Sequence, residues 1–210
     1  MPRSRGMGGS GEDEAREGTR RRLERSFFDR PALEVARELL GCVLVRLEPR
    51  GERLSGVISE TEAYAGPEDL GCHARAGRTA RNASLWGPPG HAYVYFTYGM
   101  HWLLNVVVEP EERAAAVLLR AIRPLEGVEL MRRRRNVSKD SALADGPGKL
   151  CQALAIDGRL DGHDLCLPGA ELFIEAGEPI PDEALRIGPR VGLFTVPEPW
   201  KSIPWRFRLR

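Results

Sequence analysis

The stretch Ala92-Tyr-Val-Tyr-Phe-Thr-Tyr-Gly-Met-His-Trp-Leu-Leu-Asn-Val-Val-Val108 carries the strongest β-strand signal in the chain. Two runs rich in aromatic and β-branched residues flank a short break around Gly99, a pattern typical of a β-hairpin. Tyr93 and Tyr95 share one face of the first strand, because successive side chains alternate across a strand. Tyr98 falls at the turn, where its ring can project from the tip. We therefore expect a protruding hairpin with a tyrosine at its end.

The segments on both sides of this hairpin mix helices and strands. Pro31 suits a first helical position, and Gly41 can close the same helix. Pro124 is expected to open a helix, and another helix is expected behind a Gly-Pro-Gly turn. The expected elements outside the hairpin are a helix at 31–40, strands at 42–47, 54–62 and 115–122, and helices at 124–135 and 145–156. Because regular βαβ units are missing, this order predicts an α+β fold: a single domain with a curved antiparallel β-sheet, flanking helices and the protruding hairpin.

The bulk composition indicates one ordinary globular domain. A chain of 210 residues with 42% hydrophobic and 29% charged residues can bury a single good core. Residues 1–19 are rich in Gly, Glu and Arg and are expected to form a disordered tail, so the domain should span 20–210. The sequence contains neither an apolar run of about 20 residues nor an apolar N-terminal stretch. We therefore expect a soluble, cytoplasmic protein with no membrane partner.

The four cysteines are widely separated in the sequence and form no CxxC pair: Cys42, Cys72, Cys151 and Cys166. The histidines are not clustered either, whereas structural zinc usually takes closely spaced Cys or His pairs. We expect reduced, buried thiols, no disulfide framework, no metal and no organic cofactor.

Positive charge is concentrated in the middle of the chain, although the formal net charge is only +1. Residues 70–139 include eleven Lys or Arg and only five Asp or Glu. The long polar stretch 66–89, expected to be a functional loop or to contain short helices, contributes Arg75, Arg78 and Arg81. Such side chains hold phosphates and orient a nucleic acid without reading its sequence.

Two other segments look like phosphate-binding features. The run Arg132–Arg135 covers a full helical turn, so it predicts a solvated helix end and not a single basic face. The segment Gly146-Pro-Gly-Lys-Leu150 lacks the Ser or Thr that follows the lysine of a phosphate-binding loop. At most it predicts a helix N-terminus that meets a backbone phosphate, with Lys149 beside it.

The segment Glu60-Thr-Glu-Ala-Tyr64 ends a predicted strand, and alternation places Glu60, Glu62 and Tyr64 on one face. Two carboxylates beside an aromatic ring, running into a long loop, suit a general base in a cleft. A solvent-facing strand edge would show the same pattern, so these residues leave both interpretations open.

The hairpin aromatics also have two interpretations. Rings at Tyr98 and Trp102, near His73 and the loop arginines, suit a surface that stacks bases, at roughly 1–3 kcal/mol per base. Aromatic strands are, however, common in protein cores.

A set of short motifs in a defined order covers nearly the whole expected domain. They are Glu60-Thr-Glu-Ala-Tyr64, Gly66-Pro-Glu-Asp69, His73, Arg81-Asn82, Pro89-Gly90, Tyr93-Val-Tyr95, Tyr98-Gly-Met100, Asn105, Leu118-Leu-Arg120-Ala121, Pro124-Leu-Glu-Gly127 and Gly146-Pro-Gly-Lys-Leu-Cys-Gln-Ala-Leu154. Each motif alone is weak, but their order and spacing resemble the alkyladenine (3-methyladenine) DNA glycosylase family over about residues 28–207.

The resemblance implies roles for the reacting groups. Glu62 would deprotonate the attacking water, and Arg120 would help to hold that water. Tyr98, at the hairpin tip, would wedge into the duplex where the base has left, as apolar side chains do in other kinked duplexes.

The resemblance also implies a pocket for the extruded base. Tyr64, His73 and Tyr95 would sandwich the base, and His73 would also hydrogen-bond to it. Asn105 would discriminate against normal guanine through the exocyclic amine of that base.

The function implied is a monofunctional base-excision-repair glycosylase that acts on double-stranded DNA. It would flip alkylated or deaminated purines (3-methyladenine, 7-methylguanine, hypoxanthine and ethenoadenine) and hydrolyse the N-glycosidic bond, leaving an abasic site. We expect a monomer associated with the nucleoid, in which Arg75, Arg78, Arg81 and Lys149 contact the DNA backbone.

Three other functions compete with this interpretation. A glycosylase that also cuts the backbone needs an amine nucleophile, for which Lys149 is the lysine at a matched position. A non-catalytic binder of distorted DNA would need Tyr98 and the arginines but not Glu62 with Arg120. A carbohydrate hydrolase would use Glu60 and Glu62, yet the sequence predicts no sugar groove.

Overall fold

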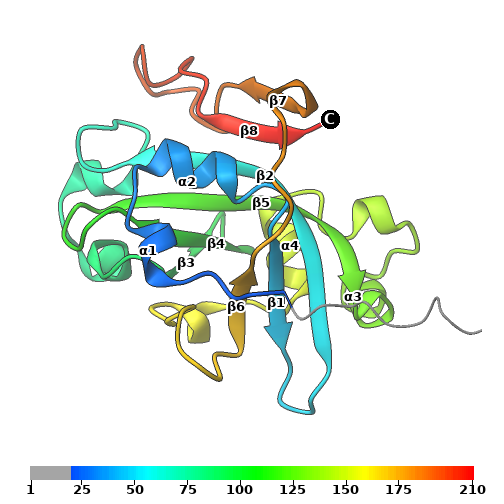
Figure 1. Cartoon of the computed structure of the whole chain (residues 1–210). Helices are drawn as coiled ribbons and strands as arrows, with labels where there is room; N and C mark the ends of the chain where they lie inside the picture. The colour runs from blue at the N-terminus through cyan, green and yellow to red at the C-terminus, as the bar shows by residue number, and fades with distance from the viewer. Residues whose placement is uncertain (1–19) are drawn as a thin grey trace, which may run out of the picture.

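The computed structural model describes residues 20–210, and the predicted tail at 1–19 lies outside the described residues. One antiparallel sheet of eight strands dominates this part of the chain (Figure 1). The strands are β1 Val43–Leu47, β2 Arg53–Ala65, β3 Ala92–Thr97, β4 His101–Val108, β5 Ala115–Glu126, β6 Leu172–Glu175, β7 Leu185–Gly188 and β8 Arg206–Leu209. The helices are α1 Arg25–Phe28, α2 Ala32–Glu38, α3 Val128–Arg135 and α4 Pro147–Ala153, with short 3-10 helices η1 His73–Ala76, η2 Ala80–Trp86, η3 Asp140–Ala142, η4 Gly158–Leu160 and η5 Asp182–Ala184. The expected α+β fold with an antiparallel sheet and flanking helices is confirmed.

Strand β2 is where the sheet branches. The main path runs β3-β4-β5-β2-β1-β6, while β8 pairs with β2 and β7 pairs with β8. Strand β1 pairs with the first half of β2, and β8 pairs with residues 60–62 in the second half. The pairing of β2 with β5 shifts register on both sides of Glu60, which is the signature of a β-bulge. Bulges bend a strand and change the direction in which its side chains point. This bulge lies at Glu60, one of the two glutamates of the predicted acidic pair, and two residues before the other, Glu62.

The two faces of the sheet have different environments. On one face, buried side chains of β2, β4 and β5 join α2 and α4 in the main core, and the Thr61 hydroxyl donates to the Ala36 carbonyl at 2.6 Å. On the other face, a smaller cluster that includes Tyr93, Val107 and Ala116 packs under the 66–89 segment. Thr61 and Ala63 of β2 face the main core, so Glu62 and Tyr64, which alternate with them, lie on this second face.

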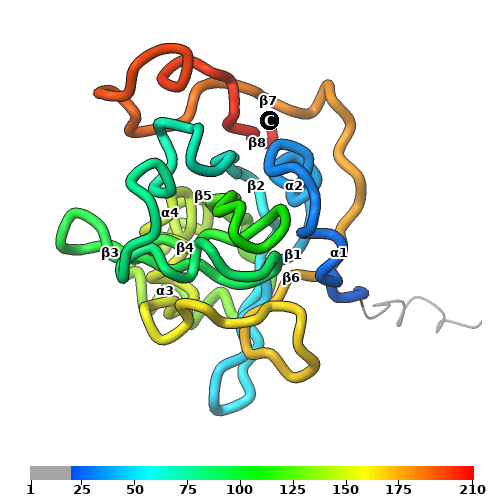
Figure 2. Tube along the Cα trace, turned by 90° about the vertical axis from the view of Figure 1, so that its left-hand side faces the viewer, coloured from blue at the N-terminus to red at the C-terminus, as the bar shows by residue number. Residues whose placement is uncertain are grey.

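The hairpin prediction is confirmed in detail. Strands β3 and β4 pair from Ala92 opposite Val106 to Thr97 opposite His101. The two turn residues, Tyr98 and Gly99, both have positive φ, at 52° and 66°. This is the backbone of a tight hairpin turn that matches the strand twist. The hairpin extends away from the rest of the chain in Figure 2, and Tyr98 is 82% exposed.

Trp102 does not belong to an exposed aromatic surface. Its ring is half-buried, lies 4.9 Å from the ring of Phe96 and covers Gly158 so closely that a Cβ there would meet it at 2.7 Å. The ring therefore packs the turn end of the hairpin against η4, and Tyr98 is left to project at the turn.

The predicted helix start at Pro124 is wrong. Strand β5 continues to Glu126, and α3 begins only at Val128, behind Gly127 in a left-handed conformation with φ of 69°. Pro124 faces Gly56 at a register shift, where a missing N–H is tolerated. A side chain at Gly127 would meet Leu54 at 2.7 Å, so only glycine fits this change of direction.

The helix expected at 145–156 is shorter than predicted, because α4 covers only Pro147–Ala153 and the Gly-Pro-Gly segment supplies its first residues. The 66–89 segment is an irregular connection built around η1 and η2, which confirms the expectation of short helices in this stretch. Within residues 20–210, none of the helices has both the length and the apolar character needed to cross a membrane.

Candidate active site

A cavity of about 320 Å³ opens between the hairpin, the η1–η2 segment and residues 191–193. This volume falls at the lower end of the range for small-molecule pockets, about 300–1,000 Å³. Six of the residues predicted from the sequence line it: Tyr64, His73, Tyr95, Tyr98, Asn105 and Arg120. The fold thus brings together side chains that are separated by up to 56 positions, from Tyr64 to Arg120.

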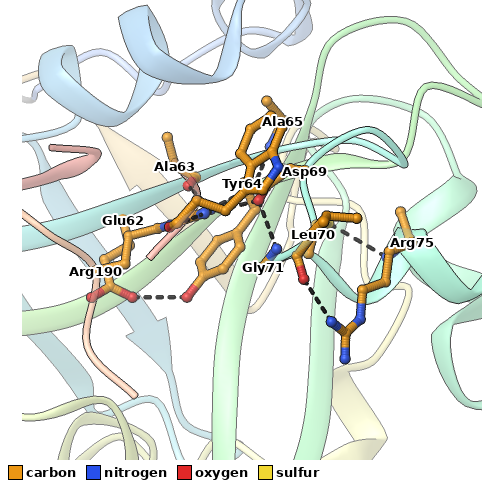
Figure 3. A network of polar contacts seen from close by, with 12 residues as sticks. Glu62, Ala63, Tyr64, Ala65, Asp69, Leu70, Gly71, Arg75 and Arg190 are labelled. Carbon is orange, nitrogen blue, oxygen red and sulfur yellow. Dashed lines mark hydrogen bonds and ion pairs between the residues drawn. The ribbon is translucent and has the colours of Figure 1, made fainter. Parts of the chain in front are cut away.

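The carboxylate of Glu62 lies behind the cavity wall formed by Tyr64 and Arg120, with an exposed fraction of 0%. The Tyr64 hydroxyl donates to one oxygen at 2.9 Å (Figure 3), and the backbone N–H of Val191 donates to the other at 2.7 Å. The guanidinium of Arg120 stands 3.3 Å from that second oxygen. Both oxygens of the buried carboxylate therefore have partners.

Burial raises the pKa of Glu62 above its ordinary value, because the charged form loses its hydration. The positive charge of Arg120 and the hydrogen bonds from Val191 and Tyr64 act in the opposite direction, while Glu60 adds to the rise. Arg120 also donates to Glu60 at 2.6 Å, so it bridges the two glutamates. The arrangement holds a carboxylate with a raised pKa away from bulk water, which suits a general base.

The aromatic wall of the cavity is formed by His73, Tyr93 and Tyr95. The rings of His73 and Tyr95 meet edge to face with centroids 4.6 Å apart, and the His73 Nδ1 shares a hydrogen bond of 2.9 Å with the Tyr93 hydroxyl. Loss of hydration, Arg81 and Arg75 all lower the pKa of His73. His73 is therefore neutral at physiological pH, and its Nε2 is left to bond to a ligand. The sequence placed Tyr93 on this face but did not assign it a role.

Asn105 is buried on β4, and its side-chain amide donates to the Tyr93 carbonyl at 3.1 Å. This bond holds the Asn105 side chain against the cavity. The side chain of Leu118 lies on the neighbouring strand, directly opposite both Asn105 and Glu62 in the pairing register. Asn105 thus presents a fixed polar group beside an apolar floor.

A buried ion pair that the sequence analysis did not identify holds the segment that carries Val191. Arg190 and Asp69 are both 0% exposed in their side chains and are joined by two hydrogen bonds, one of them 2.8 Å long. Arg190 also donates to the carbonyls of Ala63 and Trp200, and its guanidinium lies 4.6 Å from the centre of the Tyr64 ring. Asp69 was part of a family-like motif without a stated role, and no local pattern marks Arg190.

The four residues predicted to contact the DNA backbone are all exposed. Arg75 donates to the Leu70 carbonyl within the same loop. Arg81 donates to the Phe96 carbonyl, and this second bond ties the loop to the hairpin. Arg78 and Lys149 pair with acidic side chains, each at 2.8 Å. The expectation that Arg132–Arg135 form no single face is confirmed, because the side chains of Arg132, Arg134 and Arg135 bond to three different parts of the chain, at Asp140, Glu48 and Gln152.

The residues from 20 to 210 hold no group of three or more His, Cys, Asp or Glu placed to bind a metal ion. All four cysteines are free, and three of them are buried. Cys72 lines the cavity, but burial raises the pKa of its thiol to about 11. It is therefore a neutral wall residue and not a nucleophile.

A family model described as methylpurine-DNA glycosylase matches residues 26–210. The chain belongs to the methylpurine-DNA glycosylase family. A relative from Streptomyces avermitilis is 51% identical over 187 residues, which cover 88% of this chain and 86% of the relative. A relative from Chlorobaculum parvum is 46% identical, over 89% of this chain and 86% of the relative. A relative from Carboxydothermus hydrogenoformans is 47% identical, over 90% of this chain and 95% of the relative. All three carry 3-methyladenine DNA glycosylase in their names.

Membership in the methylpurine-DNA glycosylase family makes this chain a DNA repair enzyme that hydrolyses N-glycosyl bonds and has DNA as its substrate. The family resemblance predicted from the sequence motifs is confirmed. A carbohydrate hydrolase is thereby excluded as the family function.

The buried Arg190–Asp69 pair predicts that a substitution outside the cavity destabilises the protein. Asp69→Asn leaves the Arg190 charge buried without a carboxylate, so we expect the free energy of unfolding to fall by about 3–5 kcal/mol. Urea denaturation measures this change. Glu112→Gln is the matched control, because it breaks the exposed pair with Arg78 and should change stability by no more than about 1 kcal/mol. Equal effects of the two substitutions would contradict a structural role for the pair.

Proposed function

We propose that this glycosylase excises alkylated or deaminated purines from double-stranded DNA by flipping the damaged nucleotide into the cavity beside Glu62. The substrates are 3-methyladenine, 7-methylguanine, hypoxanthine and ethenoadenine, and the product is an abasic site. The observation that supports this proposal most is the buried carboxylate of Glu62, held by Tyr64, Val191 and Arg120 behind a cavity with aromatic walls. We also propose that the enzyme acts as a monomer.

The proposed reaction uses Glu62 as the base. Cleavage of the glycosidic bond develops positive charge on the sugar, and the ionised carboxylate stabilises that charge while it takes a proton from the attacking water. Each oxygen of the Glu62 carboxylate has two lone pairs, so it can accept a hydrogen bond from the attacking water in addition to the bond that it accepts from Tyr64 or Val191.

The pocket side chains have separate proposed roles. Tyr64, His73 and Tyr95 hold the extruded base between their rings, and neutral His73 hydrogen-bonds to it through Nε2. Asn105 excludes guanine by meeting its exocyclic amine. Tyr98 fills the gap in the duplex and offsets part of the stacking energy that base flipping removes.

We also propose that the enzyme does not cut the DNA backbone. A lyase reaction needs an unprotonated amine in the site. No lysine of the described residues lines the cavity, and Lys149 is exposed and paired with Asp145 at 2.8 Å. We further propose that Lys149 and the loop arginines Arg75, Arg78 and Arg81 exchange these protein contacts for backbone phosphates when DNA binds.

Single-turnover base release from duplexes with one hypoxanthine or one 3-methyladenine analogue tests the reaction. Glu62→Gln should lower the rate by at least about a hundredfold while lesion binding is retained, because general base catalysis contributes about 10²–10⁴. Glu111→Gln removes an exposed carboxylate and serves as the control. Strand breaks should appear only after alkali.

The outcomes separate the alternatives. Tight lesion binding without release by the wild type would indicate a non-catalytic binder. Equal release by wild type and Glu62→Gln would remove Glu62 from the mechanism. Strand breaks without alkali would establish lyase activity.

The pH dependence tests the state of the base. The rate should rise with pH as Glu62 loses its proton, with a midpoint above that of an ordinary glutamate, because burial raises its pKa. Tyr64→Phe removes a donor that stabilises the ionised form, so the rising limb should move to higher pH. Tyr95→Phe removes a hydroxyl from the same pocket that is not bonded to Glu62, and its profile should stay in place. A shift in both variants or in neither would contradict the assignment.

The wedge role depends on the ring at the hairpin tip. Tyr98→Ala should weaken binding to a lesion duplex by roughly tenfold, which corresponds to about 1.4 kcal/mol, within the range of one stacked base. Tyr98→Phe keeps the ring and should bind like the wild type in a fluorescence titration. Unchanged affinity and turnover of Tyr98→Ala would remove the wedge from the mechanism.

A further inference from the structure

We propose that Arg186, Arg206 and Arg208 form a second DNA contact, a binding site for a backbone phosphodiester on the far side of the base cavity from the hairpin. The proposal rests on the function proposed above, because it requires duplex DNA to lie across the cavity. The three arginines come from the paired strands β7 and β8. The sequence shows that the segment after Trp205 is basic, but it assigns no role to these arginines.

The pairing register places these side chains together. Arg186 is directly opposite Arg208, and Arg206 is two residues before Arg208 on the same strand. Residues that are opposite or two apart share a face of a sheet, so all three project to one side. A hollow of about 230 Å³ lies between them, and Ile187, Gly188 and Pro189 complete its lining.

The positive charge of this hollow is compensated only in part by carboxylates. Within residues 20–210, Arg186 and Arg208 form no ion pair, and Arg206 reaches only Glu60, at 3.5 Å. Glu60 is already bonded to Arg120 at 2.6 Å, so it is shared by two cations. Like charges directly opposite across two strands destabilise a sheet. An anion seated between Arg186 and Arg208 would turn this repulsion into attraction.

Other arginines of the same sheet show the contrasting arrangement. Arg46 pairs with Glu171 at 2.6 Å, and Arg53 pairs with both Glu126 and Glu175. The missing partners at β7–β8 are therefore a local feature and not a property of every strand arginine in this arginine-rich chain.

The hollow is on the face of the sheet that holds the cavity. Arg206 is opposite Glu62 and Arg208 is opposite Glu60 in the pairing of β8 with β2. Between them, Phe207 is buried in the main core on the other face. Since opposite residues share a face, the arginines stand on the same side as the Glu62 carboxylate.

The strand order separates this site from the loop arginines. The cavity lies over strands β3, β4, β5 and β2, and the sheet continues from β2 through β8 to β7 on the side away from the hairpin. Arg81 is tied to β3 through the Phe96 carbonyl. Basic groups thus flank the cavity on both sides, and a strand that places one nucleotide in the cavity would meet phosphate-binding groups before and after it. Planar guanidinium groups suit phosphate, because they can bond to two of its oxygens at once.

The test compares the salt dependence of binding to a lesion duplex. Arg186→Gln combined with Arg208→Gln should weaken binding and lower the slope of log Kd against log salt by about 0.9 for each phosphate that the variant no longer neutralises. Arg50→Gln combined with Arg133→Gln removes the same charge from two positions away from this face, and its slope should stay at the wild-type value. Arg186→Lys combined with Arg208→Lys retains the charge and should retain most of the slope. The single-turnover rate at saturating protein should not change, because none of these residues touches the cavity.

The outcomes are distinct from those that test the reaction. An unchanged slope in the variant that combines Arg186→Gln with Arg208→Gln would overturn the proposal. Equal reductions of the slope in the Gln variant and in the control would also overturn it, because they would indicate a net-charge effect only. Base release by the wild type is measured separately. Its absence would contradict the proposed glycosylase function, whatever the slopes of the variants are.

Discussion

The buried carboxylate of Glu62 is the group around which this enzyme is organised. A charge removed from water must be compensated by hydrogen bonds and by an opposite charge, or it takes up a proton. Here the compensation comes from three separate parts of the chain: the hydroxyl of Tyr64 on the same strand, the guanidinium of Arg120 on β5 and the backbone of Val191. Burial outweighs this compensation, so the pKa of Glu62 is raised, and Arg120, Val191 and Tyr64 limit the rise.

The compensation in turn requires a second layer. The segment that carries Val191 has little regular structure of its own, and it is held by the Arg190–Asp69 pair and by the carbonyls that Arg190 contacts. The pair is costly to bury and provides stability only if both partners are present. It connects the strand that bears Glu62 with the loop that completes its hydrogen bonds, so in the proposed mechanism stability and catalysis depend on the same contact.

The distribution of charge follows a similar division. Arg46 and Arg53 on the sheet are neutralised by nearby carboxylates and serve the fold. Those around the cavity are exposed or are bonded only to carbonyls and shared carboxylates. Because the net charge is only +1, the proposed DNA contacts rely on these local groups, which would also orient the duplex over the cavity.

The sequence by itself determined the hairpin, the α+β class and the family, because alternation, turn residues and motif order are local properties. It also placed Glu62 and Tyr64 on one face, since that alternation is a property of one strand. The tertiary structure alone decided which distant groups neutralise Glu62, because the contacts of Val191, Asp69 and Arg190 join segments more than 100 residues apart. It also decided the end of β5, where Pro124 signals a helix locally but is accommodated in a strand opposite Gly56. Pairing and packing outweigh local preference there, because a register shift removes the need for the missing N–H.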